Sequence, residues 1–412
     1  MKILYLHQYF ATPSSNAGTR SYEMAKRLTA NGHEVIFVTS SAYLSSDYKL
    51  GRGWNVLDIE GFMVHVLHLP YANTDSYLKR ISKFLQFSIR ASLKCLKIKS
   101  DVVLATSTPL TIAIPGIIYS KINKVPMVFE VRDLWPELPV AVGAIKNPIL
   151  IWLAKKLEYY TYHNSTRLVG LSPGMCDGIK RKGIASDKIT LATNSCDTKL
   201  FDVDQNIGDD YRKESLSFVG DRKLVVYTGT FGPINDVSYL VHLAKASLVR
   251  SSNACFVAIG SGMQKELVIE LAKSEGVLNN NLFILDPVPK TEIVKLLSAA
   301  DLALSLFGSV KEMWHNSANK MFDALASGTP IAINYGGWQK DLIENHKCGL
   351  VLQGKDFSQA AGLIDDFLNN ESAYDFAKLA CKDLAYNHYS RDIMAERLEN
   401  ALLEAVNAQK NV

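Results

Sequence analysis

The sequence predicts an α/β protein in which parallel sheets are covered by helices. The first observation is that both halves of the chain alternate short apolar runs with stretches of helical periodicity. The second is the length of 412 residues, which exceeds one ordinary core and indicates two domains. The third is that glycines and polar side chains follow several apolar runs. Such loops lie at the carboxyl ends of parallel strands, so two Rossmann-like domains facing each other across a cleft are expected.

The first half holds five expected strands with helices between them. The strands are short, mostly apolar runs over Lys2–Leu6, Glu34–Thr39, Val102–Ala105, Met127–Val131 and Leu168–Leu171. Helical spacing of apolar residues extends over Thr19–Ala30 and Asn147–Tyr162. The run Val102–Ser120 carries no charge, but Pro109 and Pro115 interrupt it. A strand, a loop and a buried helix are therefore expected there instead of a membrane span.

The second half repeats this arrangement. Its expected strands are Leu224–Tyr227, Cys255–Ile259, Leu282–Leu285, Leu302–Leu306 and Pro330–Asn334. Its expected helices are Asp236–Val249, Gln264–Ser274, Thr291–Ala299 and Asn319–Ser327. The polar, weakly patterned stretch 204–210 places the boundary within Asp197–Arg222. The expected domains are thus 1–200 and 201–389, followed by a closing helix in 390–412 that starts near Ser390 and would pack back on the first domain.

Composition and charge narrow the classes of protein. The chain is 48% hydrophobic and 21% charged, as soluble globular proteins are. Its six cysteines include no C-x-x-C pair, which argues against a zinc or redox centre and favours a cytoplasmic location. Residues 1–200 carry 25 Lys and Arg against 14 Asp and Glu, a net charge of +11, whereas residues 201–412 carry 20 against 27, a net charge of −7. The first half is therefore expected to meet an anionic partner or surface.

The segment Asn316–Ile331 is the most informative stretch for chemistry. Asn316, Ser317, Asn319 and Lys320 stand at the expected start of a helix, and Asp323 lies one turn further on. A helix N-terminus offers free N–H groups and partial positive charge, which suit a phosphate. A lysine, an amide and a carboxylate together would hold the phosphates and ribose of a nucleotide, although an ordinary helix with a polar start fits the same residues.

Glycine-bearing loops follow three of the expected strands. Gly18 and Arg20 belong to the stretch Asn16–Arg20, which lacks the G-x-G-x-x-G pattern of a nicotinamide site. In the second half the loop residues are Gly229, Thr230, Gly232 and Asn235 after one strand, and Gly260 and Gly262 after the next. They are predicted to bind a donor ligand, with simple turn chemistry as the alternative.

The run Glu130–Glu137 concentrates charge at the expected end of a strand. It contains Arg132, Asp133, Trp135 and Glu137. A position at the carboxyl end of a parallel strand favours a role in a site. A buried pair between Arg132 and a carboxylate is the structural alternative. P-loop, G-x-S-x-G and H-E-x-x-H motifs are absent, and no metal site is expected.

The stretch Tyr77–Lys99 reads as a basic amphipathic helix. It has seven Lys and Arg and no acid, and apolar residues recur at spacings of three and four. This pattern is typical of a helix on an anionic membrane surface, and we assign that role to Lys79, Arg80, Lys83, Phe84 and Arg90. A domain helix with a solvated basic face is the alternative. Nucleic acid is not expected as a partner, because no nucleic-acid-binding motif accompanies the charge.

These motifs together resemble glycosyltransferase family 4, whose members are retaining enzymes with the two-domain GT-B fold. The resemblance spans nearly the whole chain and is strongest over Tyr227–Ile333, while the run Arg132–Glu137 resembles a bacterial branch that builds O-antigen and capsule repeat units and includes fucosamine transferases. It implies that the C-terminal domain binds a nucleotide sugar and the N-terminal domain binds the acceptor. It also implies that no metal or other cofactor is needed.

The chain departs from the family pattern at several positions. The usual Glu-x7-Glu pair falls on His315 and Asp323, and Thr230 and Asn235 stand where family members place Arg and Lys. Lys320 would supply the missing charge for the diphosphate, together with Arg20. Pro289 and Lys290 lie where the family holds the base. The histidine of the family's catalytic region is not evident, and Asp133 stands nearest to its place.

The function implied by the resemblance is transfer of a sugar from a UDP-linked donor, such as an N-acetylated deoxy sugar, to a polyprenyl-diphosphate-linked saccharide at the cytoplasmic face of the inner membrane. Lys320 and Asp133 are the expected catalytic residues, with Asp133 accepting the proton of the acceptor hydroxyl. Arg132, Trp135 and Glu137 are expected to bind the acceptor. The alternatives are a sugar-nucleotide epimerase of the same fold and a non-catalytic binding or assembly subunit.

Overall fold

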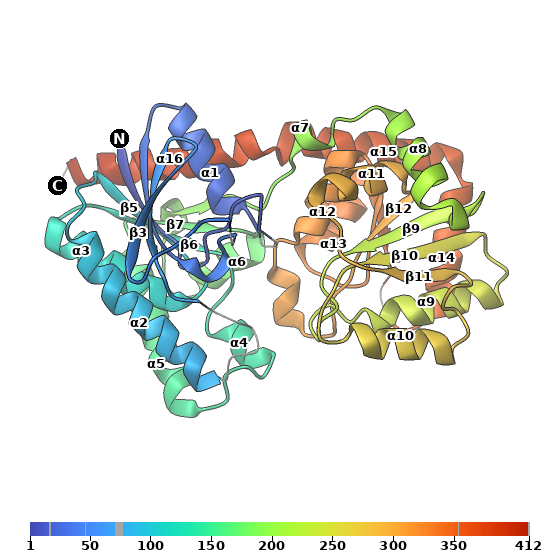
Figure 1. Ribbon diagram of the computed structural model, residues 1–412, viewed down its shortest axis with the longest axis horizontal. Coiled ribbons are helices and arrows are strands. Elements are labelled where there is room, and N and C mark those ends of the chain that lie inside the picture. Colours follow the sequence, from blue (N-terminus) through green and yellow to red (C-terminus); the bar gives the residue numbers. More distant parts are fainter. Residues whose placement is uncertain (16–17, 46, 71–76, 353, 411–412) are drawn as a thin grey trace. The chain divides into compact units, whose positions relative to one another are not determined.

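The computed structural model describes residues 1–15, 18–45, 47–70, 77–352 and 354–410. It divides into two compact units (Figure 1). One comprises Met1–Thr193 with Arg391–Val412, and the other comprises Asn194–Ser390. Each unit is built around one sheet with helices on its faces, so the predicted class of two Rossmann-like α/β domains is confirmed.

The first unit contains an eight-stranded sheet. Its strands are β1 (Lys2–Leu6), β2 (Glu34–Ser40), β3 (Trp54–Ile59), β4 (Phe62–Leu67), β5 (Val102–Thr106), β6 (Met127–Val131), β7 (Arg167–Gly170) and β8 (Ile189–Leu191). They lie in the order β3-β4-β2-β1-β5-β6-β7-β8, and every pair is parallel except β3 with β4. The chain order reverses between β1 and β5. The loops that follow these two strands therefore lie next to each other, where ligands bind in open α/β sheets.

Helices cover both faces of this sheet (Figure 1). They are α1 (Arg20–Ala30), α2 (Tyr77–Cys95), α3 (Ala113–Asn123), α4 (Glu137–Ala141), α5 (Pro148–His163), α6 (Pro173–Lys180) and α16 (Arg391–Lys410). Asn147 starts α5 by accepting a hydrogen bond from the Ile149 amide at 2.9 Å, with Pro148 in the first turn. The last helix, α16, packs on α1 and on β7 through a buried stripe that includes Met394, Leu398 and Leu402.

The second unit contains a six-stranded, wholly parallel sheet. Its strands are β9 (Lys223–Thr228), β10 (Ala254–Ile259), β11 (Leu282–Leu285), β12 (Leu302–Ser305), β13 (Ile331–Ile333) and β14 (Gly349–Val351). They lie in the order β11-β10-β9-β12-β13-β14. Its helices are α7 (Thr198–Phe201), α8 (Gln205–Ser215), α9 (Ser238–Val249), α10 (Lys265–Ser274), α11 (Lys290–Ala299), α12 (Asn319–Ser327), α13 (Trp338–His346), α14 (Phe357–Asn369) and α15 (Glu371–Asp383). The chain order reverses between β9 and β12.

Several details differ from the sequence prediction. The stretch expected to be a weakly patterned linker forms α8, whose Gly208 lies so close to the Ser298 carbonyl that a Cβ would come within 2.6 Å of its oxygen. Strands β3, β4, β8 and β14 were not predicted. The β3–β4 hairpin turns at Glu60 and Gly61, which both have positive φ, and β8 and β14 are edge strands of three residues each. Such short strands carry too little alternation to be recognised.

Candidate active site

The predicted donor loops lie at the point of the second sheet where the chain order reverses. β9 and β12 are neighbours, so the loop that follows β9 lies beside the segment that follows β12 and leads into α12. This is the position at which a parallel sheet offers loop backbone and a helix N-terminus to a ligand. The structure therefore brings the predicted residues to the ligand-binding edge of the second sheet.

The glycines of the two loops permit close backbone packing. A Cβ on Gly260 would lie 1.8 Å from the Gly229 carbonyl oxygen, and a Cβ on Gly262 would lie 2.3 Å from the Phe231 oxygen. Backbone hydrogen bonds from Gly229 to the Ile259 oxygen and from Phe231 to the Ser261 oxygen, both 2.9 Å, join the loops. Glycine is therefore needed at positions 260 and 262 because the backbones of the two loops pack directly on each other.

Lys320 lies against the first of these loops. A Cβ on Gly229 would stand 2.4 Å from Lys320 Cε and 2.8 Å from Nζ, so a larger residue there would displace this lysine side chain. The ammonium lies 5.3 Å from the centre of the Tyr227 ring. Among the residues that the structure describes, Lys320 has no ion pair and no side-chain hydrogen bond. Burial lowers the pKa of Lys320 to about 8, although Asp323 favours the charged form.

The N-terminus of α12 completes a cationic corner. Ala318 precedes the helix and provides no side-chain cap, so the first amides of α12 have no side-chain acceptor in the described part of the chain. Gly328, with φ of 72°, ends the helix in the left-handed conformation that favours glycine. The positive charge of a half-buried lysine beside an uncapped helix start is the charge that a diphosphate would neutralise.

Asp323 and Lys290 form an ion pair with each other. Lys290 is the first residue of α11, after Pro289, and its ammonium also lies 5.2 Å from the Phe201 ring centre. Asp323 is 18% exposed, so one carboxylate remains near the surface one turn into α12. The two residues that were predicted separately from the sequence are thus brought together.

The remaining predicted donor residues differ in their surroundings. Ser317 is buried, and its hydroxyl and carbonyl accept hydrogen bonds from Asn194 at 2.9 and 2.7 Å. Ser317 therefore supports the local fold, and its role at the donor stays a prediction. The side-chain oxygen of Asn316 is buried without a hydrogen-bond partner among the described residues. The side chains of Thr230 and Asn319 are exposed, Gly232 is buried and Asn235 is half-buried.

In the first unit, Asp133 follows β6 and is half-buried. It forms no hydrogen bond within the described parts of the chain. Burial raises the pKa of Asp133 to about 6, and the nearby Arg132 only partly offsets this effect. A carboxylate with a pKa near neutrality is suited to accept a proton from a hydroxyl group.

Arg132 forms no ion pair with a carboxylate among the residues that the structure describes. One of its guanidinium nitrogens, Nη1, lies 3.2 Å from His7 Nε2, and its amide donates to Ser107 Oγ at 2.9 Å. Burial and the charge of Arg132 hold the pKa of His7 well below its usual range, so the ring is neutral. Because Nε2 accepts from Arg132, Nδ1 carries the proton and donates to Ser21 Oγ at 2.9 Å. His7, at the end of β1, thus anchors the residue next to Asp133.

Arg20 was predicted to bind the donor, but the structure gives it a structural role. Its guanidinium is 5% exposed and donates to Glu130 at 2.9 and 3.1 Å and to the carbonyl oxygens of Ala192 and Thr193. Burial raises the pKa of Glu130, but Arg20, Arg132 and the hydrogen bond from Thr106 outweigh burial and lower it overall. Four N–H donors of Arg20 are therefore occupied within the fold.

The residues expected to bind the acceptor have different surroundings. Trp135 is partly buried and packs against the core of the first unit. Glu137, at the start of α4, forms an ion pair with Lys182 at 3.0 Å, and Lys182 also meets the buried Glu158 at 2.8 Å. This pairing engages one carboxylate oxygen of Glu137, and its role at the acceptor stays a prediction. Gly18 is exposed ahead of α1, while Asn16 and Ala17 of the same motif lie outside the described residues.

The predicted basic helix is present as α2, but some of the side chains that were expected at its membrane face are half-buried. Lys79 and Arg90 are exposed, whereas Arg80 and Lys83 are half-buried. Phe84, expected near the acyl chains, is half-buried and lies 6.3 Å from the Tyr9 ring in an edge contact. The side chains of Tyr77 and Leu78 lie outside the described residues.

Sequence reasoning missed His7 and Glu130. His7 follows the first strand directly, and Glu130 is a lone carboxylate inside an apolar strand, which are usable signals. Their partners, Arg132 and Arg20, are 125 and 110 residues away in sequence, so only the fold identifies them.

Comparison with known families identifies both units. Residues 17–195 match the glycosyl transferase 4-like domain, and residues 209–389 match glycosyl transferases group 1. The chain carries both domains of a GT-B glycosyltransferase. Among curated proteins, it is 22% identical to WcaI of Escherichia coli (strain K12), named for colanic acid biosynthesis, over 69% of this chain and 71% of that protein. It is 21% identical to the uncharacterized glycosyltransferase MJ1607 of Methanocaldococcus jannaschii, over 59% of this chain and 61% of that protein.

Solved structures show the same fold for this glycosyltransferase. Anabaena HepE, solved with UDP and glucose, superposes with a TM-score of 0.70 at 15% identity over 98% of this chain and 99% of that chain. WaaG, a glycosyltransferase involved in lipopolysaccharide biosynthesis, gives 0.67 at 14% identity over the same shares. A Listeria monocytogenes protein described as a UDP-N-acetylglucosamine 2-epimerase gives 0.61 at 13% identity, over 99% of this chain and 97% of that chain. The fold is therefore shared by transferases and epimerases.

Proposed function

We propose that this glycosyltransferase moves a sugar from a UDP-linked donor to a polyprenyl-diphosphate-linked saccharide, with retention at the anomeric carbon. The observation that carries the donor half is the unpaired ammonium of Lys320 beside the uncapped start of α12, among the described residues. A diphosphate would supply the negative charge that the Lys320 ammonium and the start of α12 lack. HepE was solved with UDP, which supports a uridine nucleotide.

The leaving diphosphate is the group that the site must stabilise. Charge develops on it as the bond to the sugar breaks, and Lys320 with the first amides of α12 would take up that charge from fixed positions. The Asp323 carboxylate would bind the ribose hydroxyls. Lys290, now paired with Asp323, would remain at the edge of the same site. No metal is required in this scheme.

Asp133 would accept the proton of the attacking hydroxyl. Its pKa of about 6 leaves it ionised at neutral pH and able to take up a proton in the reaction. His7 and Arg132 would hold the loop that carries it. Trp135 would contribute apolar surface to the acceptor.

The proposed acceptor is a saccharide carried on a lipid diphosphate, as used in O-antigen, capsule or related pathways. It is supported by WcaI, named for colanic acid, and by WaaG of lipopolysaccharide biosynthesis. It is also supported by the net charge of +11 in residues 1–200 and by the basic helix α2. A donor sugar of the FucNAc type and a cytoplasmic, peripheral location on the inner membrane complete the proposal.

Incubation of the purified protein with candidate UDP-sugars tests this function. Labelled sugar should enter the lipid fraction only when a polyprenyl-diphosphate saccharide is present, and EDTA should leave the rate unchanged. Release of an altered UDP-sugar without acceptor would instead indicate an epimerase. Binding of UDP-sugars without any turnover on a panel of acceptors would indicate a binding subunit. Either result would overturn the transfer assignment.

A further inference from the structure

Two helices of the first unit, α2 and α5, expose large apolar side chains in addition to the apolar residues that they bury. On α2 the buried residues include Phe87 together with Ser88 and Ser92, while the large apolar Ile89 and Leu93 are 64% and 63% exposed. The buried serines are satisfied by donating to backbone carbonyls, Ser88 at 2.9 Å and Ser92 at 2.8 Å. A helix surrounded by water places its large apolar side chains inward, so the outward stripe on α2 indicates an apolar medium outside.

Among the described residues, helix α5 exposes more large apolar side chains than α2 does. Its buried residues include Glu158, which is 1% exposed and paired with Lys182, whereas Ile149, Trp152 and Leu153 are 67%, 58% and 49% exposed. Tyr159 and Tyr160 are also exposed on this helix. The helix thus buries Tyr162 and the Glu158 carboxylate on its inner side and directs Ile149, Trp152 and Leu153 outward.

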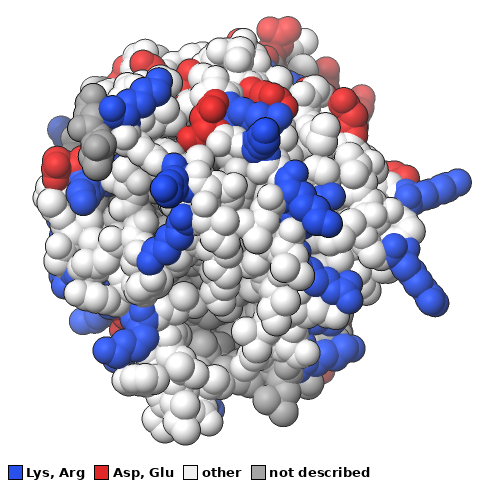
Figure 2. Space-filling model, turned by 90° about the vertical axis from the view of Figure 1, so that its left-hand side faces the viewer, with Lys and Arg blue, Asp and Glu red and all other residues white. Residues whose placement is uncertain are grey.

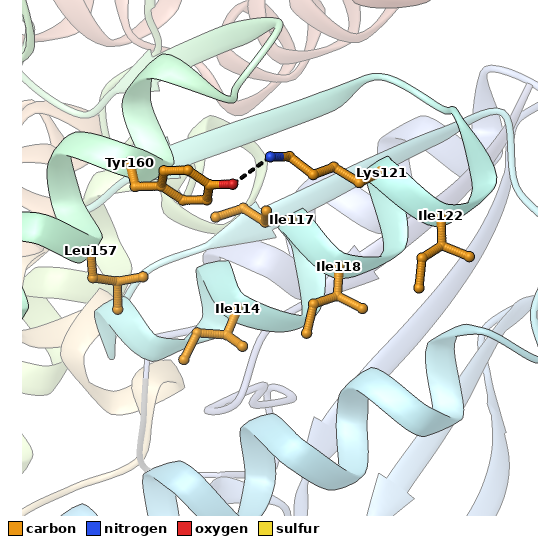
Figure 3. A pocket seen from close by; sticks show the side chains of 7 residues that line it. All are labelled: Ile114, Ile117, Ile118, Lys121, Ile122, Leu157 and Tyr160. Atoms are coloured by element: carbon orange, nitrogen blue, oxygen red, sulfur yellow. Dashed lines mark hydrogen bonds between the residues drawn. The ribbon is translucent and has the colours of Figure 1, made fainter.

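An apolar groove lies between α3 and α5 and includes the exposed Tyr160. Figure 3 shows isoleucine side chains of α3 along one wall, and Leu157 and Tyr160 of α5 along the other. The groove encloses about 370 Å³ and is lined by Ile114, Ile117, Ile118, Lys121, Ile122, Leu157 and Tyr160. The Lys121 ammonium donates to the Tyr160 hydroxyl and lies 4.7 Å from the centre of its ring. Helix α3 also contacts α2, so the three helices form a continuous surface.

The charge around this apolar surface has one sign. Residues 77–99, 113–124 and 146–163 contain twelve Lys and Arg and a single acid, the buried Glu158. In Figure 2 the acidic side chains gather mainly toward the top of this side of the protein, and the lower part is white with Lys and Arg at its edges. The same three segments hold ten of the twenty-one exposed large hydrophobic residues in the described chain. A contiguous patch of this kind marks an interaction site.

We infer that the outer face of α2, α3 and α5 docks on an anionic lipid bilayer, with Ile149, Trp152 and Leu153 of α5 inserted at the acyl boundary. The cations would meet lipid headgroups, and the exposed Trp and Tyr would occupy the interface between headgroups and chains. A second copy of the same chain fits poorly, because two faces rich in Lys and Arg repel each other. The inference rests on the proposed function only in that the acceptor lipid lies in a bilayer.

A matched pair of triple variants tests the surface. The change Ile149→Ser, Trp152→Ser and Leu153→Ser should lower partitioning onto vesicles of mixed anionic and neutral phospholipid by about tenfold or more. The control is Val249→Ser, Leu267→Ser and Leu379→Ser, whose parent residues are 74%, 61% and 70% exposed in the second unit. The control should bind vesicles like the parent protein. Both triples replace exposed side chains, so their folding should match that of the parent.

Trp152 provides a direct probe of insertion. Vesicles with brominated acyl chains should quench the tryptophan fluorescence of the parent, and most of this quenching should disappear in Trp152→Phe. Equal vesicle binding by both triples, or quenching that persists in Trp152→Phe, would overturn the inference. A concentration-dependent dimer that the α5 triple abolishes would also overturn it, in favour of contact between copies.

The surface and the proposed function can fail separately. If transfer is never observed but vesicle binding depends on α5, the surface stands and the function fails. If the α5 triple transfers sugar to a short soluble acceptor and binds vesicles normally, the function stands and the surface fails. When both hold, the α5 triple loses activity only on long-chain lipid acceptors in vesicles.

Discussion

Replacement of Lys320 by methionine separates ligand binding from stability. The side chain keeps a similar length but loses the charge that we assign to the diphosphate. A hydrogen bond to a charged group contributes about 1.5–3 kcal/mol, so UDP affinity should fall by about 10- to 150-fold. The matched control is Lys295→Met, which removes an exposed lysine paired with Glu292 in the same unit. That control should bind UDP like the parent.

The same change should not destabilise the protein. Burial lowers the pKa of Lys320 from 10.5 to about 8, which corresponds to a cost of about 3 kcal/mol for the charged form in the folded state. This cost is present in full below pH 8, where both states are protonated, and fades as pH rises toward 10.5. At pH 7 Lys320→Met removes the cost, so its free energy of unfolding should equal or exceed that of the parent.

Titration calorimetry with UDP and urea unfolding measure the two quantities. The expected result is weaker UDP binding with equal or greater stability. In the parent, UDP affinity should also fall as pH rises above about 8, because free Lys320 loses its proton there. Unchanged UDP affinity in Lys320→Met would refute the assignment. Weaker binding together with a large loss of stability would show that Lys320 supports the fold.

Three further changes test other parts of the account. Asp133→Asn should lower sugar transfer by about 10²–10⁴-fold with unchanged UDP affinity. In the parent, the transfer rate should rise with pH through about 6 as Asp133 ionises. Near-normal transfer by Asp133→Asn would exclude a base role. Arg20→Met leaves Glu130 buried without its main partner and should lower the free energy of unfolding by about 3–5 kcal/mol, whereas the exposed-pair control Lys180→Met should change it by under about 1 kcal/mol. Equal effects in the urea curves of these two variants would contradict the role of Arg20. Gly260→Ala places a Cβ 1.8 Å from the Gly229 oxygen and should weaken UDP binding. The effect should exceed that of the control Gly276→Ala, whose Cβ meets no atom within 4 Å. Equal UDP affinities by calorimetry would mean that the two loops are not tightly joined.

The sequence predicted the central strands and most helices because their periodicity is local. The runs at Lys2–Leu6 and Met127–Val131 are buried throughout or nearly so, and their boundaries agree with the structure. The edge strands β8 and β14 and the half-exposed β3 were missed, because each is short or mixes polar and apolar residues. Edge strands need only one partner and show weaker patterns.

The candidate site was predictable where its residues stand close in sequence. Lys320 and Asp323 share one helix, so one stretch of sequence predicted both, whereas the packing of Lys320 on Gly229 required the fold. The role of Arg20 was not predictable, because Arg20 begins helix α1 whereas its partner Glu130 lies on strand β6, 110 residues away. The role of His7 depends in the same way on Arg132. Pairs of this kind arise from the packing of distant segments, which no local pattern records.

The outward apolar face of α5 also escaped the sequence analysis. Its sequence reads as an ordinary apolar helix, and only the burial of Glu158 and the exposure of Trp152 show which side faces the core. For α2 the basic composition was informative, but the position of Phe84 toward Tyr9 required the fold. Composition identifies the kind of surface, whereas packing decides which side chains reach it.

A crystal structure of the protein with UDP tests the central claim most directly. We predict that the diphosphate lies at the start of α12, with an oxygen within about 3 Å of Lys320 Nζ and of a first-turn amide, and that a ribose hydroxyl meets Asp323. The Lys290–Asp323 pair should open or share its carboxylate with the ribose. A diphosphate bound away from α12, with Lys320 still unpaired, would contradict the account.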